Sequence, residues 1–140
     1  MALKFSIGLQ GSYPIRDYID IAQRIENYGF DEVHVYDDLM FKPTWPLLTL
    51  IGEHTDRIHV GPGIITPQIV HPCYHAGNLA ELDELTQGRA LCGIARGAFW
   101  EFLGIEKQKN PITMVREAIQ IIRRLMSGDR SPFHGEVSVS

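Results

Sequence analysis

Strand-length apolar runs recur along this chain at a spacing close to 30 residues. The four runs cover residues 4–9, 32–36, 59–65 and 90–95, so successive starts lie 28, 27 and 31 residues apart. The intervals between them show the i, i+3, i+4, i+7 spacing of an amphipathic helix. Repeated strand–helix units of this kind build a parallel sheet that is covered by helices.

Capping residues predict where the four helices begin and end. The first helix ends at Gly29 and carries one apolar face, made of Tyr18, Ile21, Ala22, Ile25 and Tyr28. The second begins with Thr44 as its N-cap and has Pro46 in its first turn. The third runs from Pro72 to Gly88, and the fourth runs from Pro111 to Gly128.

Two parallel folds fit this pattern, an open doubly wound sheet and a (β/α)8 barrel. The segment GLQGSYP after the first run lacks the G-x-G-x-x-G spacing of dinucleotide-binding folds. Four units are half of a barrel, which typically needs about 250 residues, and the last residues, HGEVSVS, indicate the start of a further strand. We therefore predict an α/β fold of the (β/α)8 TIM-barrel type, with residues 1–140 as a single domain that forms its N-terminal half. Unpaired strand edges predict a homo-oligomer.

Charge and composition argue against several classes of partner. The formal charge is −4 and the basic residues form no stripe, so we predict no nucleic-acid partner. We also predict no membrane contact, because no apolar run approaches the ~18 residues of a membrane helix. The strand-like start leaves no room for a secretory signal. Cys73 and Cys92 lie in apolar segments, which predicts buried, reduced thiols and a cytoplasmic location.

Several segments, in their order and spacing, carry a family resemblance. They are IENYGFDEVHVYDDLMF at 25–41, G-P-G-I-x-x-P at 61–67, L-D-E-L-x-x-G-R-A at 82–90, and the run ahead of Gly97 followed by L-G-I at 103–105. Together they resemble the bacterial-luciferase-like superfamily. The resemblance is stronger to its branch that uses the deazaflavin coenzyme F420, which includes the methylenetetrahydromethanopterin reductases.

The resemblance implies a barrel that binds a planar ring at its C-terminal mouth. The family has a non-prolyl cis peptide in a bulge after the third strand, and the matching bond here is Gly63–Ile64. Such a bond would explain the Gly-Pro-Gly interruption at 61–63, although a bulge that only curves the barrel would also explain it. The resemblance places Gly63, Ile64, Ile65 and Thr66 against the cofactor. It also places there the small residues Ala95, Gly97 and Ala98, beside which a flat ligand can approach.

Asp37 and Asp38 end the second strand, where a barrel places its chemistry. The family usually has Asp-His here, so the resemblance places Asp37 near the ring, and Asp38 replaces the histidine. Adjacent carboxylates raise one pKa, which would make Asp38 a catalytic proton donor. Alternatively, Asp38 faces water or caps the next helix.

Two acids of the family are replaced in this chain, by Gly8 in the first strand and by Ala98 after the fourth. Glu101 could take the place of the second acid only if its loop turns inward. Arg96 would face the ring edge or pair with a surface acid, and Phe99 and Trp100 would line the substrate side of the mouth. His71 and His75 have the i, i+4 spacing of two metal ligands, but we predict a capping His71, a surface His75 and no metal site.

The predicted function is that of an oxidoreductase that transfers hydride between reduced F420 and a small organic substrate. One alternative is an FMN-dependent luciferase-like monooxygenase. Another is a half-barrel fragment or assembly partner without activity of its own. A further alternative is a metal-dependent hydrolase that uses Asp37, Asp38 and the histidines.

Overall fold

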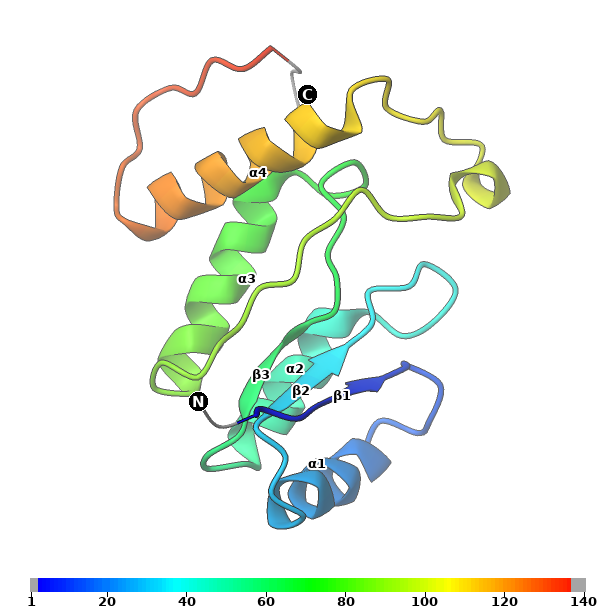
Figure 1. Ribbon diagram of the computed structural model, residues 1–140, viewed down its shortest axis with the longest axis vertical. Helices are drawn as coiled ribbons and strands as arrows, with labels where there is room; N and C mark the ends of the chain where they lie inside the picture. The colour runs from blue at the N-terminus through cyan, green and yellow to red at the C-terminus, as the bar shows by residue number, and fades with distance from the viewer. Residues whose placement is uncertain (1–2, 137–140) are drawn as a thin grey trace.

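The computed structural model describes residues 3–136, in which strands and helices alternate along the chain (Figure 1). In chain order the elements are β1 (Ser6–Leu9), α1 (Asp17–Asn27), β2 (Glu32–Val35), α2 (Thr44–Glu53), β3 (His59–Pro62), α3 (Pro72–Leu85), the short 3-10 helix η1 (Trp100–Leu103) and α4 (Pro111–Met126). The further strand predicted at the end of the chain falls largely on 137–140, outside the described residues.

The three strands form one parallel sheet in the order β1-β2-β3. Successive side chains of a strand point to opposite faces, so Val33 and Val35 of β2 share a face, and both are fully buried. They belong to a core with side chains of α1 and α2. The other face of β2 carries Glu32 and His34, and continues to Tyr36. We call it the inner face of the sheet.

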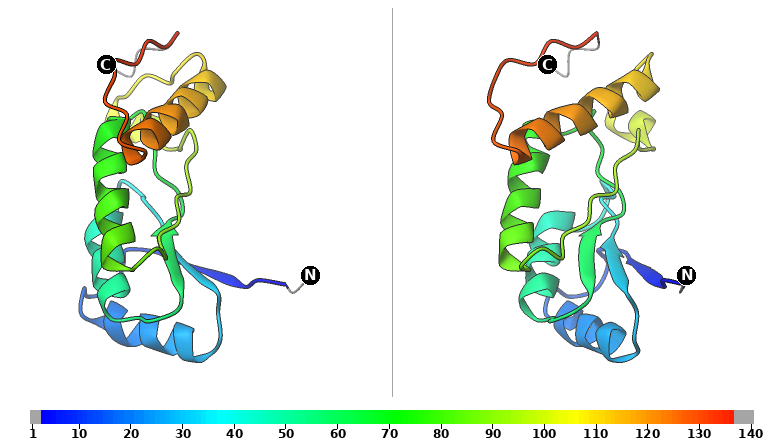
Figure 2. Two further views of the ribbon diagram at one scale, coloured as in Figure 1. Left: turned by 90° about the vertical axis from the view of Figure 1, so that its left-hand side faces the viewer. Right: turned by 60° about the vertical axis from the view of Figure 1, so that its left-hand side comes forward.

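A fourth segment runs alongside β3 but is not the regular strand that the sequence predicts at 90–95 (Figure 2). Only two bridges form, from Ala90 to Val60 and from Ile94 to Ile65. Backbone bonds still connect the segments, for example from the N–H of Leu91 to the carbonyl of Val60 at 2.8 Å. Pro62 offers the ladder no N–H, which is a physical reason for the gap between the bridges.

The two glycines around Pro62 make room for neighbouring groups. A Cβ on Gly61 would lie 2.3 Å from the carbonyl oxygen of Leu91, and one on Gly63 would lie 2.8 Å from the Cβ of His34. Every peptide bond in residues 3–136 is trans, Gly63–Ile64 included, so the predicted cis bond is wrong. Close approach of the fourth segment and of β2 accounts for the glycines instead.

The helix termini agree with the sequence in part. Gly29 follows α1 with φ = 84°, as a terminating glycine should, but Tyr28 is 74% exposed and lies off the predicted apolar face. Pro43 takes the N-cap position of α2, whereas Thr44 is its first residue and donates its hydroxyl to the carbonyl of Val35 at 3.0 Å. His71 caps α3 as predicted, because its Nδ1 accepts from the N–H of Cys73.

Helix α4 crosses one end of α3, and a second core lies beside them (Figures 1 and 2). This core contains Ile65, Ala76, Leu79 and Ile122.

Both cysteines are exposed, contrary to the prediction, because Cys73 lies in the first turn of α3 and Cys92 in the irregular fourth segment. Within residues 3–136, none of the helices has the length and apolar character needed to cross a membrane.

Candidate functional site

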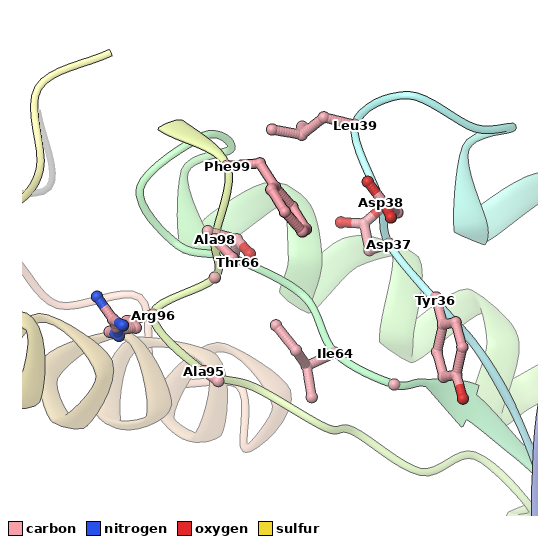
Figure 3. Close-up of a pocket in the computed structure, with 12 residues that line it drawn as sticks. Tyr36, Asp37, Asp38, Leu39, Ile64, Thr66, Ala95, Arg96, Ala98 and Phe99 are labelled. Carbon is pink, nitrogen blue, oxygen red and sulfur yellow. The ribbon is translucent and has the colours of Figure 1, made fainter. Parts of the chain in front are cut away.

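A cleft of about 410 Å³ opens where β2, β3 and the fourth segment end (Figure 3). This is the carboxyl end of a parallel sheet, where α/β barrels place their sites. The volume falls in the range of about 300–1,000 Å³ that is usual for small-molecule sites. Its lining residues are Tyr36, Asp37, Asp38, Leu39, Gly63, Ile64, Thr66, Ala95, Arg96, Gly97, Ala98 and Phe99.

The cleft brings together most of the residues that the sequence singles out. Eight of the nine candidate site residues line it: Asp37, Asp38, Gly63, Ile64, Thr66, Ala95, Gly97 and Ala98. The ninth, Ile65, is fully buried in the core with α3 and α4 and does not reach the cleft. Successive residues of an extended segment point to opposite sides, which explains why Ile64 faces the cleft and Ile65 does not.

The two adjacent carboxylates lie together on one side of the cleft (Figure 3). Burial raises the pKa of Asp37 above its ordinary value, the charge of Asp38 raises it further, and the backbone N–H of Thr44 partly offsets both effects. Within this pair the perturbed pKa is that of Asp37, whereas the proton donor predicted from the sequence is Asp38. Asp38 also forms a turn, since its carbonyl accepts from the N–H of Phe41 at 3.0 Å.

The opposite wall comes from the segment after Ile94, which has an unusual backbone. Gly97 has φ = 76°, and Phe99 has φ = 65°, a region that bulky residues rarely adopt. The ring of Phe99 is half exposed and reaches across the cleft opposite Leu39 (Figure 3). Such a conformation in a cleft wall is typical of functional sites.

Two charged groups near this wall stay away from the centre of the cleft. Arg96 belongs to the lining, but its guanidinium is directed away from Asp37 and Asp38 (Figure 3). Glu101 is not part of the lining and forms an ion pair of 2.6 Å with Lys107. The loop therefore does not turn Glu101 into the cleft.

Leu39 and Tyr36 line the cleft but are not among the residues predicted from the sequence. The signal for Tyr36 was present, because it follows Glu32 and His34 at the two-residue period of one strand face.

His75 was predicted on the surface, but it is 2% exposed and its ring packs 6.1 Å from the ring of Trp45. Burial lowers the pKa of His75, which favours the neutral imidazole. Within residues 3–136, no three His, Cys, Asp or Glu side chains gather as metal ligands do.

Comparisons with known proteins agree with this fold. The 5,10-methylenetetrahydromethanopterin reductase of Archaeoglobus fulgidus is 32% identical over 127 residues, which are 89% of this chain and 37% of that protein. The F420-dependent glucose-6-phosphate dehydrogenase of Rhodococcus erythropolis is 27% identical, over 97% of this chain and 46% of that protein. The chain thus spans less than half the length of these relatives.

Among solved structures, the coenzyme F420 dependent tetrahydromethanopterin reductase from Methanopyrus kandleri aligns with a TM-score of 0.90 at 25% identity. The alignment covers 96% of this chain and 43% of that one. The predicted α/β fold of TIM-barrel type is therefore confirmed. The family model described as luciferase-like monooxygenase matches residues 2–139, so the chain belongs to the luciferase-like monooxygenase family.

Proposed function

We propose that this chain carries the ring-binding part of an oxidoreductase site, which transfers hydride between F420 and a small organic substrate. The cleft supports this proposal most, because one of its walls is made largely of residues with small side chains and faces the carboxyl groups of two aspartates. The dehydrogenase of Rhodococcus erythropolis and the reductase from Methanopyrus kandleri carry F420 dependence in their names and match nearly the whole chain, which favours F420 as the cofactor.

The lining residues suit a flat ring. Gly63, Ala95, Gly97 and Ala98 project at most a methyl group, and Ile64 points between the two walls (Figure 3). A ring in this cleft would rest one face against Ile64, and the small residues beside it would leave the other face open to substrate. Bound F420 would supply the hydride, because its ring carries two electrons at a time.

The protein itself would position the cofactor and the substrate, exclude water from them and hold a proton. A raised pKa means that Asp37 keeps its proton to a higher pH than an exposed aspartate does. A carboxylic acid of this kind can donate a proton to an oxygen on which charge develops. We therefore assign the proton-holding role to Asp37 and an electrostatic role to Asp38, whose charge helps to raise the pKa of Asp37.

Two other functions follow from specific observations. FMN has a ring of similar shape, and the family description names monooxygenases, so FMN is the alternative cofactor. A role as an assembly partner is favoured by the sheet edge at β1, beside which Leu3 and Phe5 are 81% and 60% exposed. A homo-oligomer would cover such an edge.

Binding of the cofactor tests the proposal directly. The full chain is titrated with F420 and, separately, with FMN, and binding is followed by the change in cofactor fluorescence. We expect F420 to bind more tightly than FMN, and Ile64→Ala to weaken F420 binding about tenfold, because the ring loses its apolar support. Ile112→Ala is the matched control, since Ile112 is 82% exposed on α4.

Each of the other outcomes has a definite meaning. Tighter binding of FMN than of F420 would favour the alternative function, that of an FMN-dependent monooxygenase. If neither cofactor binds, the proposed function is wrong and the assembly role remains. Equal F420 affinity of wild type and Ile64→Ala would show that the ring does not lie against Ile64.

A further inference from the structure

The side chain of Tyr36 lies over Gly8 on the inner face of the sheet. A Cβ on Gly8 would lie 2.2 Å from Oη of Tyr36 and 2.6 Å from its Cζ, so the ring occupies the space of a side chain at position 8. The N–H of Tyr36 donates to the carbonyl of Leu9 at 2.9 Å, which holds this residue against β1 beyond the end of β2. Glycine at position 8 is thus the condition for this placement of Tyr36.

The hydroxyl group of Tyr36 forms no hydrogen bond within the described part of the chain. Within residues 3–136 it has no hydrogen-bond partner, and the side chain belongs to the cleft lining at 44% exposure. The two neighbouring side chains on the same face, His34 and Glu32, interact with each other, since Nε2 of His34 lies 3.3 Å from Oε2 of Glu32. The ring lines the cleft, whereas the hydroxyl is directed away from Asp37 and Asp38 and toward Gly8 (Figure 3), where it is free to donate to a ligand oxygen that reaches the inner face of the sheet.

The charges and walls of the cleft limit what that ligand can be. Asp37 and Asp38 present carboxyl groups, and the basic side chain of the lining, Arg96, is directed away from them (Figure 3). A phosphate ester would therefore bring its negative charge beside like charges. Leu39 and Phe99 form apolar surface across the mouth, which suits the hydrocarbon body of an uncharged molecule.

We propose that Tyr36 binds the substrate by donating a hydrogen bond from Oη to the carbonyl or hydroxyl oxygen of a small, uncharged organic molecule. This inference rests on the proposed function, because it names the substrate class of the same cleft. Gly8 takes part indirectly, as the residue that leaves room for the phenol ring.

Ligand-observed NMR on the full chain tests this role, with cyclohexanone carrying carbon-13 at its carbonyl as the probe. Titrations are made with and without F420, and glucose 6-phosphate serves as the anionic probe. A hydrogen bond from Oη shifts the carbonyl resonance on binding, and we expect Tyr36→Phe to abolish this shift and to weaken binding about fivefold. Gly8→Ala, which displaces the phenol, should produce the same loss.

The double variant and a distant tyrosine provide controls. Tyr36→Phe combined with Gly8→Ala should bind no more weakly than either single variant, because both remove one contact. Tyr74→Phe removes a phenol hydroxyl that is 67% exposed on α3, and it should leave the binding of cyclohexanone unchanged.

An unchanged carbonyl shift in Tyr36→Phe would overturn the role of Tyr36. Tighter binding of glucose 6-phosphate than of cyclohexanone would overturn the substrate class. A wild-type chain that does not bind F420 contradicts the proposed function alone, because the cyclohexanone titration without F420 still measures the contribution of Tyr36.

Discussion

The Oε1 atom of Glu26 lies 2.6 Å from the backbone nitrogen of Arg57 and 2.9 Å from that of Ile58. The N–H of Asp56 donates to the same carboxylate at 3.0 Å, and Glu26 is only 7% exposed. Helix α1 is thereby tied to the turn that leads into β3. Burial disfavours the charged carboxylate, but the three backbone donors outweigh this effect and lower the pKa of Glu26.

Glu26→Gln should destabilise the protein by about 2 kcal/mol at pH 7, because the amide removes the charge and turns an NH2 group toward backbone donors. The lowered pKa means that the stabilisation by ionised Glu26 is present above the unfolded value of 4.5 and is lost as pH falls through the folded pKa. Urea unfolding at several pH values measures this difference, and Glu84→Gln on the exposed face of α3 is the control. A difference that does not shrink in acid would contradict the assignment.

Arg89→Lys should cost about 2–3 kcal/mol of the free energy of unfolding, since an ammonium group cannot replace the planar fork of donors. The guanidinium donates to the carbonyls of Ile58 and Thr55 at 2.7 Å each, to that of Gly52 at 3.0 Å and to that of Thr86 at 2.9 Å. Thermal unfolding checks this expectation. Arg123→Lys, at an exposed position on α4, should leave the midpoint unchanged.

Gly61→Ala should destabilise the protein by about 2 kcal/mol or more, because the new methyl group would overlap the carbonyl of Leu91. The fourth segment would have to move, so F420 affinity should fall together with stability. Gly77→Ala makes the same chemical change in α3, where nothing lies within 4 Å of the new Cβ. It should instead stabilise the protein by about 0.5–1 kcal/mol. Equal effects of the two substitutions would argue against the close approach at Gly61.

Asp37→Asn should make the protein more stable at pH 7 while removing the proposed proton donor. Because the folded pKa of Asp37 is raised, wild-type stability decreases as pH rises from the unfolded value of 3.8 through the folded pKa. The gain in Asp37→Asn should therefore disappear below that unfolded value. Asp38→Asn removes the neighbouring charge, so it should lower the folded pKa of Asp37 and with it the upper end of this pH window. Chemical denaturation across pH follows both variants, and a gain that persists in acid would contradict the raised pKa.

Local patterns in the sequence were sufficient to predict the layered fold and the place of the two aspartates in the cleft. The family resemblance selected the segments after Pro62 and after Ile94. Helical periodicity and terminating glycines place four helices, and the rule that barrel chemistry follows strand ends selects Asp37 and Asp38. These features depend on neighbours within a few residues, which is why a single sequence contains them.

Contacts between distant segments could not be predicted in this way. The relation of Gly8 to Tyr36 depends on the register of β1 against β2, in which Gly8 pairs with His34. The role of Gly61 likewise depends on the approach of Leu91, 30 residues later. A glycine whose function is to make room looks the same in sequence as one that permits an unusual bond, and this ambiguity led to the wrong cis assignment.

Glu26 and Arg89 bind the loops that enter the strands, whereas Tyr36, Leu39 and Phe99 gather where the strands finish. The anchoring network and the ligand-facing network therefore share no side chain. Evolution, or a protein engineer, can exchange the second set to accept new ligands while the first keeps the scaffold intact.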